Sequence, residues 1–136
     1  MYFFNKISVM DEDKAKVEGY RDLIVWQKSI ALVKQIYQLT QNFPTDEKFG
    51  LISQMRRAAV SIPSNIAEGQ ARRTTGDYVR FVSIAEGSLA ELDTQLIVAI
   101  ELSFCTRIQT KEVFLLMVEI RKMLNALRRS LMSKVD

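Results

Sequence analysis

Apolar residues recur at the three- and four-residue spacing of an α-helix in four stretches of the chain. These stretches cover about residues 22–43, 46–69, 78–99 and 110–131. Glycine occurs five times and proline twice, which is sparse for a β protein that needs turn residues at every reversal. With 136 residues, 48% of them hydrophobic, the chain can bury one core but not two domains. These features predict an all-α fold, an antiparallel up-down four-helix bundle.

Capping and helix-breaking residues predict where these helices begin and end. Asp22 is the predicted N-cap of the first helix. Pro44 ends that helix, because a proline disfavours α geometry in the residue before it. Thr45 and Asp46 are expected to cap the second helix, and Thr110 is expected to cap the fourth.

Proline and glycine predict an irregularity in the second helix. Pro63 removes a backbone donor and clashes with the preceding turn, so the helix is expected to be kinked or broken near it. Asn65 and Glu68 have the spacing of a capping box for a restarted helix. Gly69 is then a candidate C-terminal stop.

The third helix is predicted to begin after the turn residues 74–77 and to carry Gly87 in its middle. A glycine inside a helix costs about 1 kcal/mol relative to alanine. Close approach by a neighbouring helix would explain such a residue, so Gly87 is predicted to lie at a helix–helix contact.

The N-terminal residues differ from the rest of the chain. Residues 1–19 carry a mixed charge cluster without apolar periodicity, which favours a loosely ordered leader, with a short extra helix as the alternative. The bundle domain is then residues 20–134. No stretch approaches about 18 uninterrupted apolar residues and no signal-peptide pattern is present, so no membrane contact is expected. A single cysteine, Cys105, fits a reducing compartment, and a cytoplasmic protein is predicted.

The sequence lacks the residues that carry most enzymatic and metal chemistry. It has no histidine and one cysteine, which excludes a Cys/His zinc site and the Glu-x-x-His pairs of di-iron bundles. Glu86 and Asp93 share a helix face, which we interpret as a solvated acidic face. Glu68 is interpreted as a capping or interhelical salt-bridge residue. We therefore predict no catalytic residue, no metal, no cofactor and no enzymatic activity.

Basic residues from distant parts of the chain should meet at one end of such a bundle. The start of the first helix, the end of the second, the start of the third and the end of the fourth share this end. It is expected to carry Arg21, Arg72, Arg73, Arg80, Arg128, Arg129 and Lys134, with Arg121 and Lys122 one heptad further along. Guanidinium groups match phosphate oxygens, so this end suits nucleic acid. The alternative is that these arginines pair with carboxylates of neighbouring helices or subunits.

The opposite end carries more apolar residues than one core can bury. Residues 96–100 and 113–118 leave no polar face on the third and fourth helices there. A helix that is apolar all round is buried all round, so the surplus face predicts a partner, most simply a second copy. A head-to-tail contact that closes would give a ring. The predicted oligomer interface consists of Ile97, Ile100, Phe104, Phe114, Leu115 and Val118.

Several sequence blocks carry a family resemblance. They include YRDL at residues 20–23, VWQK at 25–28, QMRRAAVSIPSNIAEG at 54–69 and IAEGSLAEL at 84–92. With these blocks the chain resembles the four-helix-bundle protein family encoded in intervening sequences of bacterial 23S ribosomal RNA genes. The resemblance implies a homopentameric ring. It also implies kinship with the accessory variability proteins of diversity-generating retroelements, which present a basic surface to RNA and to a reverse transcriptase.

The resemblance further assigns roles to individual residues. The basic positions of the family pattern correspond to Arg56, Arg57 and Arg72. The polar positions, which belong to bundle or ring packing, correspond to Asn65, Glu68 and Ser88. Together with the charge argument, this gives the predicted nucleic-acid-binding residues Arg56, Arg57, Arg72, Arg73, Arg80, Arg121, Lys122, Arg128 and Arg129.

Two classes of function therefore stay open from the sequence. The first is a non-enzymatic homo-oligomer that binds RNA through its arginine-rich end. The second is a protein–protein interaction scaffold, either the ring itself or an accessory subunit of a reverse transcriptase. A small-molecule pocket in the channel of a ring is a weaker third hypothesis. The net charge of +3 is modest beside the retroelement relatives.

Overall fold

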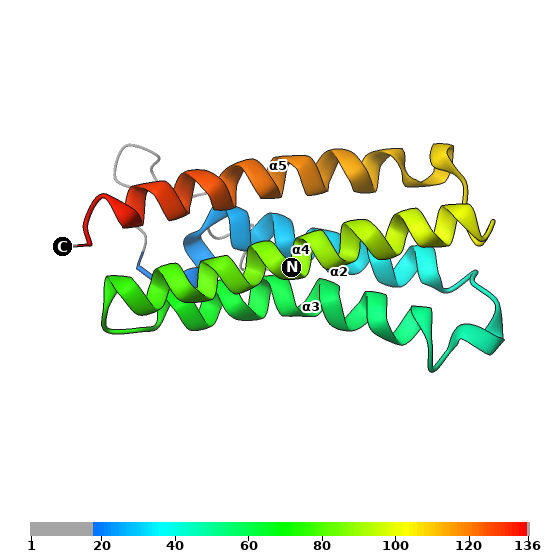
Figure 1. Ribbon diagram of the computed structural model, residues 1–136, viewed down its shortest axis with the longest axis horizontal. Helices are drawn as coiled ribbons and strands as arrows, with labels where there is room; N and C mark the ends of the chain where they lie inside the picture. Colours follow the sequence, from blue (N-terminus) through cyan, green and yellow to red (C-terminus); the bar gives the residue numbers. More distant parts are fainter. Residues whose placement is uncertain (1–17, 136) are drawn as a thin grey trace.

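The computed structural model describes residues 18–135, so most of the predicted leader lies outside the described residues. The described part folds into long α-helices and two short 3₁₀ turns, and no strand occurs within it (Figure 1). In chain order the elements are η2 Tyr20–Asp22, α2 Ile24–Thr40, η3 Thr45–Glu47, α3 Leu51–Gln70, α4 Thr75–Glu101 and α5 Arg107–Met132.

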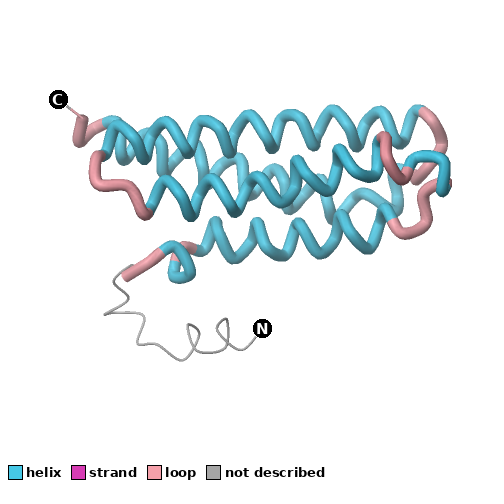
Figure 2. The backbone as a smooth tube through the Cα atoms, turned by 90° about the horizontal axis from the view of Figure 1, so that it is seen from below, coloured by secondary structure: helices cyan, strands magenta, loops and turns pink. Residues whose placement is uncertain are grey.

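The long helices form an antiparallel up-down bundle. Each runs opposite to the one before it, and the connections gather at the two ends of the molecule (Figures 1 and 2). At one end, which we call the α3–α4 end, α2 begins, α3 ends, α4 begins and α5 ends. The opposite end, the α4–α5 end, holds η3 and the loop between α4 and α5. The fold class predicted from periodicity is confirmed.

One core runs the length of the bundle. All four long helices of the described region contribute side chains that are fully buried, each worth about 1.5–3 kcal/mol relative to an exposed one. They include Leu32, Ile36, Met55, Ile62, Ile66, Leu92, Leu96, Ile120 and Leu124. Each long helix therefore buries one face in the core, and the residues on its other faces lie at the surface.

Helices α4 and α5 both begin about one turn earlier than predicted, α4 at Thr75 and α5 at Arg107. The Thr74 hydroxyl accepts from the Asp77 backbone N–H at 3.1 Å, which makes Thr74 the N-cap of α4. Thr106, and not Thr110, caps α5 in a reciprocal capping box with Gln109. Thr110 lies inside the helix, where its buried hydroxyl donates to the Thr106 carbonyl at 3.0 Å.

The predicted cap of the first helix is also wrong. Asp22 lies in η2, and α2 begins at Ile24 with Leu23 as a residue that offers no side-chain cap. The Asp22 Oδ2 instead accepts from the backbone N–H of Glu18 at 3.0 Å. The Asp22 carboxylate is therefore engaged by the backbone around the 3₁₀ turn and does not cap the first turn of α2.

The start of α3 is shifted for a similar reason. Thr45 and Asp46, the predicted caps, lie in the 3₁₀ turn η3, and Gly50 occupies the N-cap position. The backbone N–H of Leu51 donates to Glu47 Oε1 at 3.1 Å, so a carboxylate from the preceding turn satisfies one free donor of the helix.

Pro63 does not break α3. The helix runs from Leu51 to Gln70 with Pro63 buried inside it, so of the two alternatives the chain continues the helix and does not restart it. Asn65 caps nothing, because its Nδ2 donates to the carbonyl and the hydroxyl of Ser61 at 2.8 and 2.9 Å. The Ser61 hydroxyl in turn lies 2.8 Å from that of Ser88 on α4. Tertiary packing and this polar cluster hold the helix through the proline.

Two glycines have roles opposite to those predicted. Gly69 is buried inside α3, and a Cβ there would lie 2.9 Å from the Phe81 Cβ and 3.3 Å from the Tyr78 carbonyl oxygen. It is therefore the point of close approach between α3 and α4, and it does not end the helix. Gly87 is exposed, and a Cβ there would meet nothing within 4 Å. The helix contact predicted for Gly87 is absent from the described part of the chain.

Candidate nucleic-acid interface

Exposed arginines from three elements meet at the α3–α4 end. Arg72 and Arg73 lie in the turn after α3, Arg80 lies on the second turn of α4, and Arg129 lies on the last turn of α5. The up-down topology brings these elements together at one end of the bundle (Figure 1). We call these four residues the arginine end.

Two of the arginines are held by an aromatic ring beneath them. The guanidinium carbons of Arg72 and Arg80 lie 4.6 and 4.7 Å from the ring centroid of Phe81. Phe81 is buried, so the core fixes the ring on which both cations rest. This cation–π contact orders the guanidinium groups and leaves their N–H edges free to donate.

The arginine end has few anionic partners of its own. Between residues 18 and 135, none of its four guanidinium groups forms an ion pair. Glu68 near the end of α3 and Asp77 in the first turn of α4 lie in the same part of the bundle. The local excess of positive charge is therefore moderate, and its distinguishing feature is the placement of unpaired guanidinium groups.

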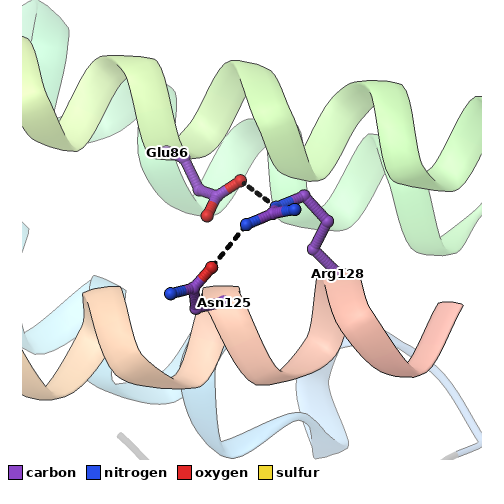
Figure 3. Close-up of polar contacts among 3 residues, drawn as sticks. All are labelled: Glu86, Asn125 and Arg128. Carbon is purple, nitrogen blue, oxygen red and sulfur yellow. Dashed lines mark hydrogen bonds and ion pairs between the residues drawn. The ribbon is translucent and has the colours of Figure 1, made fainter. Parts of the chain in front are cut away.

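Arg128 is committed to a contact between helices. Its Nε donates to Glu86 Oε1 on α4 at 2.9 Å, and its terminal nitrogen donates to Asn125 Oδ1 (Figure 3). Glu86 and Arg128 are both half-buried. For Arg128, the alternative of an interhelical salt bridge is therefore the arrangement observed. Glu86 is accordingly a salt-bridge residue, whereas the sequence indicated only a solvated acid.

Arg121 and Lys122 lie further along α5, and both are exposed. Arg121 lines a hollow of about 220 Å³ together with Glu86 and Asp93 of α4. The two carboxylates thus share a face, as predicted, and Arg121 lies beside them. Its surroundings are less favourable to a phosphate than those of Arg72 or Arg80.

Arg56 and Arg57 do not join the arginine end. They lie on α3 about 14 residues before its last residue, or roughly 21 Å along the helix axis. Arg56 donates from Nε to Thr40 Oγ1 at 2.9 Å and from its terminal nitrogen to the Tyr37 carbonyl at 3.3 Å. It therefore caps the carboxyl end of α2, where a cation is favourable. Arg57 is exposed beside it.

The α4–α5 end exposes apolar side chains. Ile97 and Leu102 are 47% and 55% exposed, and Ile108 and Leu115 are 89% and 61% exposed. We call these four residues the apolar end. Ile108 and Leu115 line a hollow of about 460 Å³ with Phe114 and Val118, which are half-buried.

Three residues of the predicted oligomer interface have partners within the chain. Ile100, Phe104 and Phe114 pack partly buried against the core, and the Phe104 ring centroid lies 5.7 Å from that of Phe43. Leu102 and Ile108 were missing from the predicted interface although both are highly exposed. Their position at the ends of helices α4 and α5, beside the connecting loop, is the signal that would have identified them.

Among the described residues, burial shifts the pKa of two groups. Desolvation raises the pKa of the Cys105 thiol and of the Tyr78 phenol above their ordinary values of 9.0 and 10.0. Cys105 is buried in the loop between α4 and α5, so at neutral pH it is a protonated thiol. In the part of the chain that the structure describes, no group of three His, Cys, Asp or Glu could hold a metal. None of the described helices combines the length and the apolar composition that a membrane span requires.

The fold and its surfaces define a four-helix-bundle protein with one basic and one apolar end. Residues 21–126 match the family model described as 23S rRNA-intervening sequence protein. The chain belongs to this family. A solved structure titled as a protein of unknown function from the S23 ribosomal protein family of Bacteroides thetaiotaomicron VPI-5482 is similar, with a TM-score of 0.70 and 25% identity. The match covers 77% of this chain and 98% of that one. No curated protein matches the chain.

Proposed function

We propose that the chain is a non-enzymatic, self-assembling bundle that binds RNA through the arginine end. The observation that carries the proposal is the pair of guanidinium groups of Arg72 and Arg80 ordered on Phe81. Such groups form bidentate contacts with phosphate oxygens. Because the ring already restricts the side chains, less conformational entropy is lost when a phosphate binds.

The proposal takes a structured RNA as the polyanion because the cations are spread over the end of the bundle. The family description, 23S rRNA-intervening sequence protein, does not state what its members bind. Arg73 and Arg129 extend the pair of stacked arginines across the end of the bundle, from the α3–α4 turn to α5. Several phosphates of a structured RNA can then be contacted at once.

A non-enzymatic role agrees with the chemistry of the side chains. The sequence contains no histidine, so the commonest general base is not available. Its one cysteine is buried, and burial raises the pKa of the thiol, which opposes a role as a nucleophile. The proposal therefore assigns function to surfaces.

The double variant Arg72→Glu/Arg129→Glu tests the proposal. We expect its affinity for an RNA hairpin to fall by at least a hundredfold, because charge-assisted contacts to two phosphates are lost and repulsion replaces them. The slope of log affinity against log salt should fall by about 0.7–0.9 for each lost contact. Arg128 is unsuitable for this test, since Arg128→Glu would face Glu86.

A matched control separates local contacts from net charge. Arg107→Glu/Lys111→Glu changes the net charge by the same amount at the opposite end of the bundle. It should leave most of the affinity intact, measured in the same titration. Equal losses in both double variants, or wild-type protein that gives no salt-dependent shift of the hairpin, would refute binding through the arginine end.

The exposed apolar end favours a second candidate, an interaction scaffold. In that role the assembled homo-oligomer, a pentamer according to the resemblance, presents a surface to another protein, such as a reverse transcriptase. The arginine end would then pair with carboxylates of a neighbouring subunit. Sedimentation of Arg72→Glu/Arg129→Glu distinguishes the two candidates: an intact assembly that has lost RNA supports the first, and dissociation supports the second.

A further inference from the structure

A second basic surface lies on the α2–α3 side of the bundle, away from the arginine end. A hollow of about 470 Å³ opens there between the last turns of α2, the turn η3 and the start of α3. Its walls include two aromatic residues, Tyr37 and Phe49, and three cations, Lys48, Arg56 and Arg57. A volume of this size is within the range of small-ligand sites, about 300–1,000 Å³.

The aromatic rings of this surface are unusually accessible. Phe49 is 89% exposed and Tyr37 is 40% exposed. The turn that carries Phe49 is fixed on both sides, because the Gly50 N–H donates to the Glu47 carbonyl at 3.0 Å and the Leu51 N–H donates to the Glu47 carboxylate. The backbone therefore holds the phenyl group at the surface, where the described chain leaves most of it uncovered.

The cations are arranged around these rings. The guanidinium carbon of Arg56 lies 4.4 Å from the ring centroid of Tyr37, and the Nζ of Lys48 lies 5.6 Å from that of Phe49. Arg56 is further fixed by its donation to Thr40, whereas Arg57 is exposed and available. Among the described residues, no aspartate or glutamate lines the hollow. The surface is therefore complementary to a ligand that is both planar and anionic.

We propose that this hollow binds an unpaired nucleotide of RNA, with its base stacked on Phe49 and its phosphate held by Lys48 and Arg57. Stacking platforms flanked by cations are how proteins hold single-stranded nucleic acid. A simple anion would use the cations without the rings, and an apolar partner would use the rings without the cations. The inference rests on the proposed function in taking RNA as the ligand, but it assigns a different surface and a different form of RNA.

The test compares two exposed apolar residues, one inside the hollow and one outside every surface proposed above. Phe49→Ala removes the ring, and Ile84→Ala removes an aliphatic side chain on α4 that is 41% exposed. Fluorescence anisotropy with full-length protein would measure binding to a single-stranded RNA of about 12 nucleotides and to a blunt RNA hairpin. We expect Phe49→Ala to weaken single-strand binding about tenfold and hairpin binding less than twofold, with Ile84→Ala unchanged on both.

A cross-link locates the contact directly. Trypsin cleaves after Lys48 and Arg56, which isolates residues 49–56 as one peptide. Irradiation of a complex with 5-iodouridine-containing single-stranded RNA should attach the RNA to this peptide. Cross-links confined to other peptides, or equal single-strand affinity of wild type and Phe49→Ala, would overturn the assignment. So would a change in sedimentation mass on Phe49→Ala, because the ring would then be covered by a second copy.

The result is separable from that for the arginine end. If Arg72→Glu/Arg129→Glu keeps hairpin binding while Phe49→Ala loses single-strand binding, the nucleotide site stands and the arginine end fails. The reverse pattern removes the nucleotide site and leaves the arginine end. Wild-type protein that binds neither RNA removes both proposals.

Discussion

The two ends of the bundle share one core but present opposite chemistry to their surroundings. At the arginine end, the apolar residue Phe81 is buried and cations lie over it. At the apolar end, Ile108 and Leu115 are the exposed residues and the cations beside them, Arg107 and Lys111, border the same hollow. Buried core residues occur at both ends, and the difference lies in the outward positions.

This difference teaches that the two ends suit different partners. A bundle needs one apolar stripe per helix, so residues outside these stripes are not dictated by folding. Exposed aliphatic side chains gain from removal of water, whereas unpaired guanidinium groups gain from phosphate or carboxylate. The proposal therefore places assembly at the apolar end and polyanion binding at the arginine end, and four experiments can break or sharpen this division.

The largest effect is expected from charges placed on the apolar end. Ile108→Asp/Leu115→Asp should convert the assembled protein to single chains, because burying two unpaired carboxylates in a contact costs several kcal/mol. Sedimentation velocity measures the change in mass. Arg73→Asp/Arg129→Asp, with two carboxylates at the other end, should keep the assembled mass. A wild-type protein that sediments as a single chain would contradict the assignment.

The second largest effect concerns the backbone contact beneath the arginine end. Gly69→Ala should lower the free energy of unfolding by about 1–3 kcal/mol, because the new methyl group overlaps Phe81 and Tyr78 where α3 and α4 meet. Gly87→Ala is the control, and it should raise that free energy by up to about 1 kcal/mol, since alanine is the better helix former and space is open. Urea denaturation measures both. Equal effects of the two substitutions would show that the close approach at Gly69 is relaxed in solution.

A third experiment uses two arginines that are adjacent in sequence but differ in environment. A double-mutant cycle on Arg128 and Glu86 should give a coupling of about 0.5–1 kcal/mol, because the pair is partly exposed and screened. Arg128→Gln should change RNA affinity less than twofold, whereas Arg129→Gln should weaken it several-fold. If Arg128→Gln is the more damaging to RNA binding, the ion pair opens when RNA binds and the boundary of the arginine end must be redrawn.

The smallest expected effect is a fall in the free energy of unfolding at alkaline pH. One ionisable group near each end of the bundle contributes to it. Burial raises the pKa of Cys105 near the apolar end and of Tyr78 near the arginine end, so the native state keeps both protons to higher pH than the unfolded chain does. Stability is therefore intact below the ordinary pKa values of 9.0 and 10.0 and declines as pH rises through the native ones.

Denaturation of wild type and Cys105→Ala at pH 7.5 and 10.5 checks this prediction. The alanine variant should lose less stability between the two pH values, because it has no thiol to ionise and only the ionisation of Tyr78 still contributes. Other alkaline titrations affect both proteins alike and cancel in the comparison. A larger loss in Cys105→Ala would contradict the sign.

Much of the fold was predictable because helical periodicity is a local property of the chain. The apolar spacing predicted each long helix, and the topology followed from their short connections. Helix ends were less predictable. Asp22 and Thr110 are not the caps expected of them, and Thr74, expected only as a turn residue, caps α4, because nearby threonines and aspartates compete for the same role. At Pro63 the sequence left a kinked and a broken helix open, and α3 continues through it because buried packing outweighs the local cost of a missing donor.

The candidate surfaces were predictable only in part. Convergence of Arg72, Arg80 and Arg129 at one end followed from topology. The ion pair of Arg128 with Glu86 joins residues 42 positions apart, and such a contact depends on how two helices rotate about their axes. Phe49 was overlooked because an aromatic residue before a helix looks like a core residue until its exposure is known.

The sequence by itself determined the secondary structure, the up-down order of the helices and the end of the bundle at which each charge lies, because all three follow from spacing along the chain. The tertiary structure decided which arginines are paired, which glycine lies at a helix contact and which aromatic rings face the surface. Those properties depend on the rotation and separation of helices, which are set by the packing of side chains distant in sequence.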